Sequence, residues 1–162
     1  MRMTKKHYAL LAQKVECQRT GKKPPRKNGG IATKPTVPCE KLLEAVVLKN
    51  CLSWLHSRGV LADRLNNGLM RSSDGERMNR YGIAGAGDII ACFRGLHIEI
   101  ECKAGKGGTL SLIQQKRKEA VEDAEGIYLI VHGVEELAEL WKERVMPWVR
   151  RTPDGVLWES VK

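Results

Sequence analysis

Hydrophobic residues recur along this chain with two different periods, which predict helices and strands. Residues 38–59 follow the helical period, because their apolar side chains lie three or four positions apart, at Val47, Leu48, Cys51 and Leu55. Pro38 near the start and Gly59 just past the end bound this helix, which we place at 38–58.

The rest of the chain predicts strands and helices in succession. The expected elements are a strand at 60–65, an Asn-rich turn at 66–68, a polar, glycine-rich stretch with one short strand at 69–87, a hairpin at 87–103, a loop at 103–109, a helix at 112–125 capped by Ser111, a strand at 126–132, a helix at 134–145 and a turn at 153–155. This order indicates an α/β fold in which helices pack against one sheet.

The hairpin, GDIIACFRGLHIEIECK, separates apolar from charged residues. A two-residue turn at Arg94-Gly95 pairs Phe93 with Leu96 and, further out, Asp88 with Glu101. One face is apolar and is expected to pack on the core: Ile89, Ala91, Phe93, Leu96, Ile98, Ile100 and Cys102. The other face carries Asp88, His97, Glu99, Glu101 and Lys103.

Asp88 and Glu101 are direct cross-strand neighbours in this register, with Cβ atoms about 5 Å apart. Like charges so placed destabilise a sheet unless a cation joins them or one pKa rises. Mg²⁺ prefers such carboxylates together with water and phosphate oxygens. With Lys103 on the same face, the pattern indicates metal-assisted phosphodiester hydrolysis. The alternative is a solvent-exposed strand face whose Glu–Lys pairs contribute little.

Glu44 lies on the otherwise apolar stripe of the first helix. A carboxylate there is costly unless it meets a partner, which a metal or a basic phosphate pocket supplies. Alternatively, Glu44 lies in the first turns, where acids favour the helix dipole, and Glu40 is the competing acid one turn earlier.

The positive charge of the protein is concentrated at one end. The net charge is +9, and residues 1–37 hold ten of the 28 Lys and Arg but only one of the 19 acids, Glu16. The other eighteen of each sign cancel. The stretch 19–36 is rich in Pro, Gly and Lys, which is typical of a flexible linker. Such an arm suits a phosphate backbone, although a solubilising tail has the same composition.

Several classes of protein are disfavoured by composition. The five cysteines form no C-x-x-C pair or zinc-type spacing, which favours reduced thiols in a cytoplasmic protein. No apolar run is long enough to cross a membrane, so no membrane contact is expected. GIAGAGD lacks the third glycine of a dinucleotide fingerprint and precedes a strand, and no phosphate-binding loop with Gly-Lys-Ser/Thr occurs, so no nucleotide cofactor is expected.

A series of short motifs occurs in a fixed order over about residues 40–140. They are Glu44 ahead of Gly59-Val60, RLNNG at 64–68, GIAGAGDII with Gly82, Gly85 and Asp88, IEIECK with Glu101 and Lys103, LSLIQ at 110–114, and GIYLIVHGVEEL at 126–137. As an ordered set they resemble the PD-(D/E)XK nuclease superfamily and, more narrowly, its VRR-NUC family. That resemblance implies a restriction-endonuclease-like core, with a mixed central sheet flanked by helices.

The resemblance also implies an activity, a Mg²⁺- or Mn²⁺-dependent endodeoxyribonuclease, and the residues that carry it. The catalytic set is Glu44, Asp88, Glu101, Lys103 and Gln114. Asp88 and Glu101 would bind the metal with the backbone carbonyl of Cys102, and Glu44 would hold it through water. Gln115 competes with Gln114, because counting back from Gly126 favours it. Glu99 has no role in the family pattern and is expected to support the site from behind or to face solvent.

Stand-alone members of this size are similar to dimeric Holliday-junction resolvases, so a homodimer acting on branched or duplex DNA is expected. The implied organisation is a basic flexible arm at 1–37, a nuclease domain at 38–147 and an extension at 148–162 that covers a sheet edge or a dimer contact. Expected nucleic-acid contacts are Lys22, Lys23, Arg26, Lys27, Asn67 and Lys106. The alternatives are a non-catalytic nucleic-acid-binding module and a sequence-specific restriction-like endonuclease.

Overall fold

The computed structural model describes residues 29–149 except 67 and 72–77. Asn67, the four expected arm contacts Lys22, Lys23, Arg26 and Lys27, and residues 150–162 therefore lie outside the described residues. The elements are β1 (Ile31–Thr33), α2 (Glu44–His56), β2 (Leu61–Arg64), β3 (Gly68–Arg71), β4 (Met78–Tyr81), β5 (Ile89–Phe93), β6 (Leu96–Cys102), β7 (Gly108–Leu110), α3 (Leu112–Asp123), β8 (Ile127–Val131), α4 (Val134–Leu140), the π-helical turn η1 (Trp141–Val145) and α5 (Met146–Val149).

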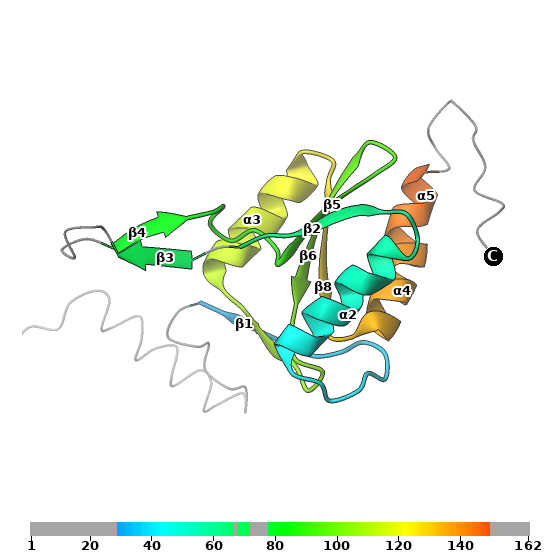
Figure 1. Ribbon diagram of the computed structural model, residues 1–162, viewed down its shortest axis with the longest axis horizontal. Helices are drawn as coiled ribbons and strands as arrows, with labels where there is room; N and C mark the ends of the chain where they lie inside the picture. Colours follow the sequence, from blue (N-terminus) through cyan, green and yellow to red (C-terminus); the bar gives the residue numbers. More distant parts are fainter. Residues whose placement is uncertain (1–28, 67, 72–77, 150–162) are drawn as a thin grey trace, which may run out of the picture.

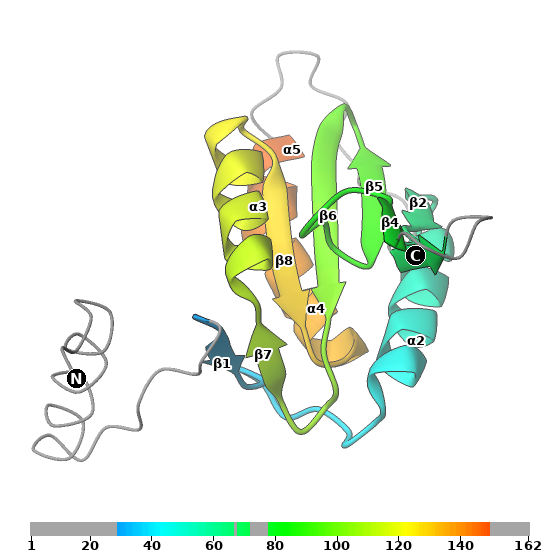
Figure 2. The ribbon, with the colours of Figure 1, turned by 90° about the vertical axis from the view of Figure 1, so that its left-hand side faces the viewer.

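A four-stranded sheet in the order β2-β5-β6-β8 forms the centre of the protein. The strands are antiparallel except for β6 and β8, which are parallel, so the sheet is mixed. Helices α2 and α4 cover one face and α3 covers the other (Figure 1). The expected mixed α/β fold is therefore confirmed, and Figure 2 shows β5, β6 and β8 side by side across it.

The predicted hairpin register is also confirmed. Phe93 pairs with Leu96 and Ile89 with Ile100, so Asp88 and Glu101, which were also predicted to pair, are the next residues beyond the paired segment. The turn residues Arg94 and Gly95 have φ angles of 56° and 80°, the positive values that a two-residue hairpin turn favours. All seven residues of the apolar face are buried in one core, which they share with Val47, Leu48, Cys51 and Leu55 of α2.

The first helix is shorter than predicted, because it begins at Glu44 rather than at residue 38. Leu43 is extended, with φ −70° and ψ 150°. The chain before it runs against the loop that follows β6: Gly105 donates its N–H to the Leu42 carbonyl at 2.9 Å, and a Cβ on Gly105 would lie 1.7 Å from the Glu40 carbonyl oxygen. These backbone contacts replace helical hydrogen bonds.

Two short sheets differ from the prediction as well. β3 and β4 form an antiparallel hairpin where one short strand was expected, and it projects from the body (Figure 1). Its base is closed by a hydrogen bond of 2.8 Å from the Leu65 N–H to the Asp88 carbonyl. The expected loop at 103–109 ends in β7, which pairs with β1.

Residues 31–36, which composition assigns to the arm, thus belong to the folded body. Besides the pairing of β1, the N–H and hydroxyl of Thr36 each donate to Glu136 at 2.8 Å. Glu136 also accepts from the backbone N–H of His132 at 2.7 Å, and the His132 ring bridges it to Thr33. Burial alone would raise the pKa of Glu136, but these hydrogen bonds from Thr36 and His132 lower it.

The last helical segment changes from an α-helix to a π-helical turn and back to an α-helix. α4 ends at Leu140, and one π-helical turn carries the buried Trp141 and Val145 before α5 begins. Among the helices of residues 29–149, none has both the length and the apolar composition needed to cross a membrane.

Candidate active site

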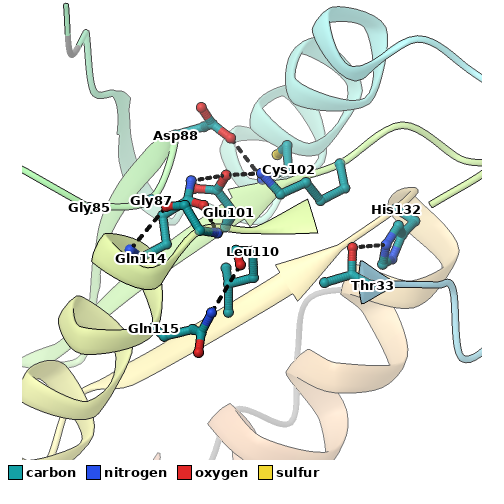
Figure 3. A network of polar contacts seen from close by, with 12 residues as sticks. Thr33, Gly85, Gly87, Asp88, Glu101, Cys102, Leu110, Gln114, Gln115 and His132 are labelled. Atoms are coloured by element: carbon teal, nitrogen blue, oxygen red, sulfur yellow. Dashed lines mark hydrogen bonds and ion pairs between the residues drawn. The ribbon is translucent and has the colours of Figure 1, made fainter. Parts of the chain in front are cut away.

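Glu101 lies at the centre of a polar cluster built from β6, α3 and β8. Its side chain is 3% exposed and that of Lys103 is 8% exposed, so this pair is buried. Lys103 donates from Nζ to Glu101 Oε1, and Gln114 of α3 donates from Nε2 to the same oxygen at 2.5 Å. The Tyr128 hydroxyl, from β8, lies 3.5 Å from Oε2. Figure 3 shows Gln114 and Asp88 on two sides of Glu101.

Asp88 is attached to the strand that carries Glu101. Its Oδ2 accepts the backbone N–H of Cys102 at 2.9 Å, while Oδ1 accepts no hydrogen bond from the described residues. The N–H of Lys103 donates to the Val131 carbonyl at 2.8 Å, so Lys103 and Cys102 point their backbone groups to opposite edges of β6. The carbonyl of Cys102 therefore lies on the Asp88 side, as its expected role as a ligand requires.

The charges of this cluster act on one another. Burial and the negative charge of Asp88 raise the pKa of Glu101 to about 7, against the opposing effect of Lys103. Glu101 is therefore partly protonated at neutral pH in the absence of a cation. Burial and the negative charge of Glu101 also raise the pKa of Tyr128 above its ordinary range, so its hydroxyl remains a neutral donor.

Gln114, rather than Gln115, contacts the candidate site. Its backbone N–H donates to Ser111 Oγ at 3.3 Å while its Oε1 accepts the Ser111 N–H at 2.8 Å, a capping box that begins α3 as Ser111 predicts. The same amide group then donates to Glu101. Gln115 instead donates to the carbonyls of Gly29 and Leu110, at 2.9 and 3.1 Å.

Glu44 is near the cluster but not part of its hydrogen bonding. It is the first residue of α2 and is exposed, which fits the helix-dipole interpretation. Its negative charge contributes to the raised pKa of Glu101, so the two carboxylates are close enough to interact through space. Lys106 is exposed in the loop after Lys103, at the edge of the same region. Glu40 contributes its backbone carbonyl to the contact with Gly105.

The glycines of GIAGAGD bring the chain close to its neighbours. Gly85 has a φ of 80°, and a Cβ there would lie 2.4 Å from the Ile113 carbonyl oxygen at the start of α3. A Cβ on Gly87 would lie 2.8 Å from the backbone of Ile100. The motif thus allows the segment before Asp88 to pass between α3 and β6.

Three residues beside the site were not assigned a role from the sequence. Glu99 is fully buried and bonded to Arg117, so of its two expected places, behind the site or facing solvent, only the second is wrong. Burial opposes ionisation of Glu99, but hydrogen bonds from Arg117, His97 and the Gly87 N–H lower its pKa. Tyr128 is the third residue, and it reaches Glu101 from β8. Gln114 and Arg117 are three residues apart on one helix, and this spacing is the sequence signal that could have indicated a role for Arg117.

The donors of the cluster fit a hard divalent cation. Within residues 29–149, as far as they are described, no three His, Cys, Asp or Glu side chains are grouped so as to hold a metal ion. Mg²⁺, however, keeps several waters and needs only one or two protein carboxylates. Asp88 Oδ1 has no partner among the described residues, and the charge of Asp88 acts on the Glu101 carboxylate.

Comparisons with known proteins found no match for this chain among family models, curated proteins or solved structures. The resemblance to the VRR-NUC family therefore rests on the ordered motifs, and the roles it implies remain hypotheses.

The raised pKa of Glu101 can be measured directly by carboxyl-carbon NMR on the metal-free protein. We expect Glu101 to titrate near 7, and Asp88→Asn to lower that pKa by about one unit or more, because a like charge is removed. Gln114→Ala is expected to raise it, because the carboxylate loses a donor, whereas Gln115→Ala leaves it unchanged. A Glu101 pKa near 4.5 in the wild-type protein would contradict the buried, like-charged pair.

Proposed function

We propose that this chain is a Mg²⁺- or Mn²⁺-dependent endodeoxyribonuclease that hydrolyses phosphodiester bonds, with a PD-(D/E)XK type of site. One observation carries the proposal: Asp88 and Glu101 are the next residues beyond the paired Ile89 and Ile100, the charge of Asp88 acts on Glu101, and Lys103 is bonded to Glu101. A mixed sheet flanked by helices, as the motifs imply, supports the same conclusion.

Asp88, Glu101 and the carbonyl of Cys102 are the groups that would hold the cation. A divalent cation held there would supply Lewis-acid polarisation of the phosphate and activation of water. Glu101 must lose its proton to act as a ligand, so activity should rise as the pH increases through about 7. Lys103 carries a positive charge into the cluster, where it stabilises negative charge on the reacting phosphate.

Gln114 and Glu44 have supporting roles in this proposal. The Gln114 amide is fixed by the capping box and by Glu101, so it can orient Lys103 or the phosphate without moving. Glu44, whose negative charge acts on Glu101, would hold the metal through water, as the family pattern implies.

DNA is the substrate that the charge distribution favours. Most of the excess positive charge lies in residues 1–28, and the chain that follows them is tied to the site region through Gly29 and Gln115. Phosphate backbones are the natural partners of such a segment. Branched DNA and a homodimer come from the resemblance to junction resolvases, because two cuts at fixed separation require two sites.

A second candidate function has its own observation in favour. Lys103 and Gln114 already donate hydrogen bonds to the Glu101 carboxylate. Among the described residues, no third acidic or histidine ligand joins Asp88 and Glu101. The same contacts would serve a purely structural cluster in a nucleic-acid-binding module. The nuclease is preferred because a raised pKa on Glu101, and an Asp88 oxygen without a partner among the described residues, add nothing to stability.

The activity is tested with a labelled four-way DNA junction. We expect the full-length protein to cut it with Mg²⁺ or Mn²⁺ and not with EDTA. Asp88→Asn and Lys103→Met should each lower the single-turnover rate by at least about 100-fold, because the first removes a proposed metal-binding carboxylate and the second removes the positive charge that would act on the reacting phosphate. Asp123→Asn removes an exposed carboxylate from the far end of α3 and should keep the wild-type rate.

Two other outcomes would identify the alternatives. Binding of the junction without cutting in either metal, unchanged by Asp88→Asn, would identify a binding module. Cutting of linear duplex at one sequence, in preference to the junction, would identify a restriction-like endonuclease.

The role of the basic arm is tested by deleting residues 1–28, which keeps β1 and its partners. Nine Lys and Arg are removed with one acid, so DNA binding should weaken and depend less steeply on salt. Each phosphate that the arm no longer neutralises changes the slope of log K against log salt by about 0.9 for duplex DNA. The matched control keeps the length but replaces the nine basic residues by Ser. An unchanged slope in both variants would exclude the arm from the DNA interface.

A further inference from the structure

An ion pair between the buried Glu99 and the half-buried Arg117 lies beside the candidate site, and the proposed chemistry does not use it. The Glu99 side chain is 0% exposed and that of Arg117 is 28% exposed. Arg117 Nε lies 3.0 Å from Glu99 Oε1 and 3.3 Å from Oε2, and Nη2 also donates to Oε1. Two guanidinium nitrogens thus fix the orientation of the carboxylate.

The same carboxylate holds the segment that leads into Asp88. The backbone N–H of Gly87 donates to Glu99 Oε2 at 3.2 Å, and His97 Nε2 lies 3.1 Å from Oε1. Gly87 immediately precedes Asp88, and it lies so close to β6 that any Cβ would overlap the Ile100 backbone. The hydrogen bond and the close contact together fix the position of the backbone immediately before Asp88.

Arg117 connects Glu99 to the other side of the site. It lies three residues after Gln114 on α3, so the two side chains share one face of the helix. Glu99 and Glu101 are likewise two residues apart on one face of β6. The Arg117–Glu99 and Gln114–Glu101 contacts therefore join the same helix to the same strand at adjacent points.

We propose that Glu99 and Arg117 are positioning residues of the candidate site. Their ion pair sets the separation between Glu101 and its two neighbours, Asp88 through the Gly87 N–H and Gln114 through α3. The kinetic consequence rests on the proposed nuclease function; the geometric consequence does not. Neither residue touches the substrate, and each acts through the groups it holds in place.

A purely structural pair that only fastens α3 to the sheet is the alternative. The double variant Glu99→Gln/Arg117→Met separates the two, because it removes both charges and leaves neither one unpaired in the interior. The matched control is Lys118→Met, which removes an ion pair of the same helix that touches neither Gly87 nor Gln114 and leaves Glu122 paired with Arg144. Arg117→Lys is the conservative variant, since it keeps the charge but not the two-nitrogen contact.

Two measurements are made on the full-length variants. In the junction assay with Mg²⁺, we expect kcat to fall by about 100-fold in the double variant with KM within about twofold, as a displacement near 1 Å can cause. Amide hydrogen exchange at Gly87 should accelerate by at least about tenfold, because its acceptor changes position. Arg117→Lys should show smaller changes of the same sign, and Lys118→Met should change neither quantity.

The outcomes separate this proposal from the nuclease proposal. Wild-type kcat or wild-type exchange at Gly87 in the folded double variant would overturn the positioning role, as would a rise in KM with kcat unchanged. Should the double variant fail to fold, Arg117→Lys decides by the same two readouts. If the wild-type protein cuts no DNA in any metal, the nuclease proposal fails, and exchange at Gly87 alone then decides whether Glu99 and Arg117 hold the segment before Asp88.

Discussion

The opposition of two carboxylates, Asp88 and Glu101, is the constraint around which this protein is arranged. A strand pair that places like charges opposite each other is destabilised unless the surroundings compensate. Here the compensation comes from Lys103 and Gln114 on Glu101 and from the Cys102 N–H on Asp88. It is incomplete, because burial beside Asp88 still raises the pKa of Glu101 to about 7. A cation that joins both carboxylates would remove the remaining cost.

The layers of the fold serve this pair from both faces of the sheet. On one face, β5 and β6 pack an entirely apolar surface against α2 and α4, so the strands that carry the acids are rigid. On the other, α3 covers the acids, and glycines 85 and 87 let the preceding segment pass closely beneath it. The buried Glu99–Arg117 pair fastens this arrangement where α3 meets β6. A rigid base beneath a partly covered polar cluster is what a site with fixed geometry requires.

The hairpin was predictable from the sequence because its period of two and its two-residue turn leave one register. The start of α2 was not predictable from the sequence. Glu40 and Gly105 are far apart in the chain, and the contact between their backbones overrides the helical pattern there. Gln114 and Gln115 could not be separated by spacing alone. The capping box with Ser111 decides between them, and it depends on where α3 begins. Arg117 could not be predicted as the partner of Glu99, because their contact depends on how α3 packs on β6, which no local pattern encodes.

The most direct test of the central claim is a calorimetric titration of the DNA-free protein with Mn²⁺, in the wild type and in Asp88→Asn and Glu101→Gln. The account predicts one site per chain in the wild type, with protons released on binding near pH 7 because Glu101 must ionise. Either variant should lose that binding, while Asp123→Asn keeps it. Absence of binding in the wild type, or binding of equal strength in all four proteins, would contradict the assignment of Asp88 and Glu101 as a metal site.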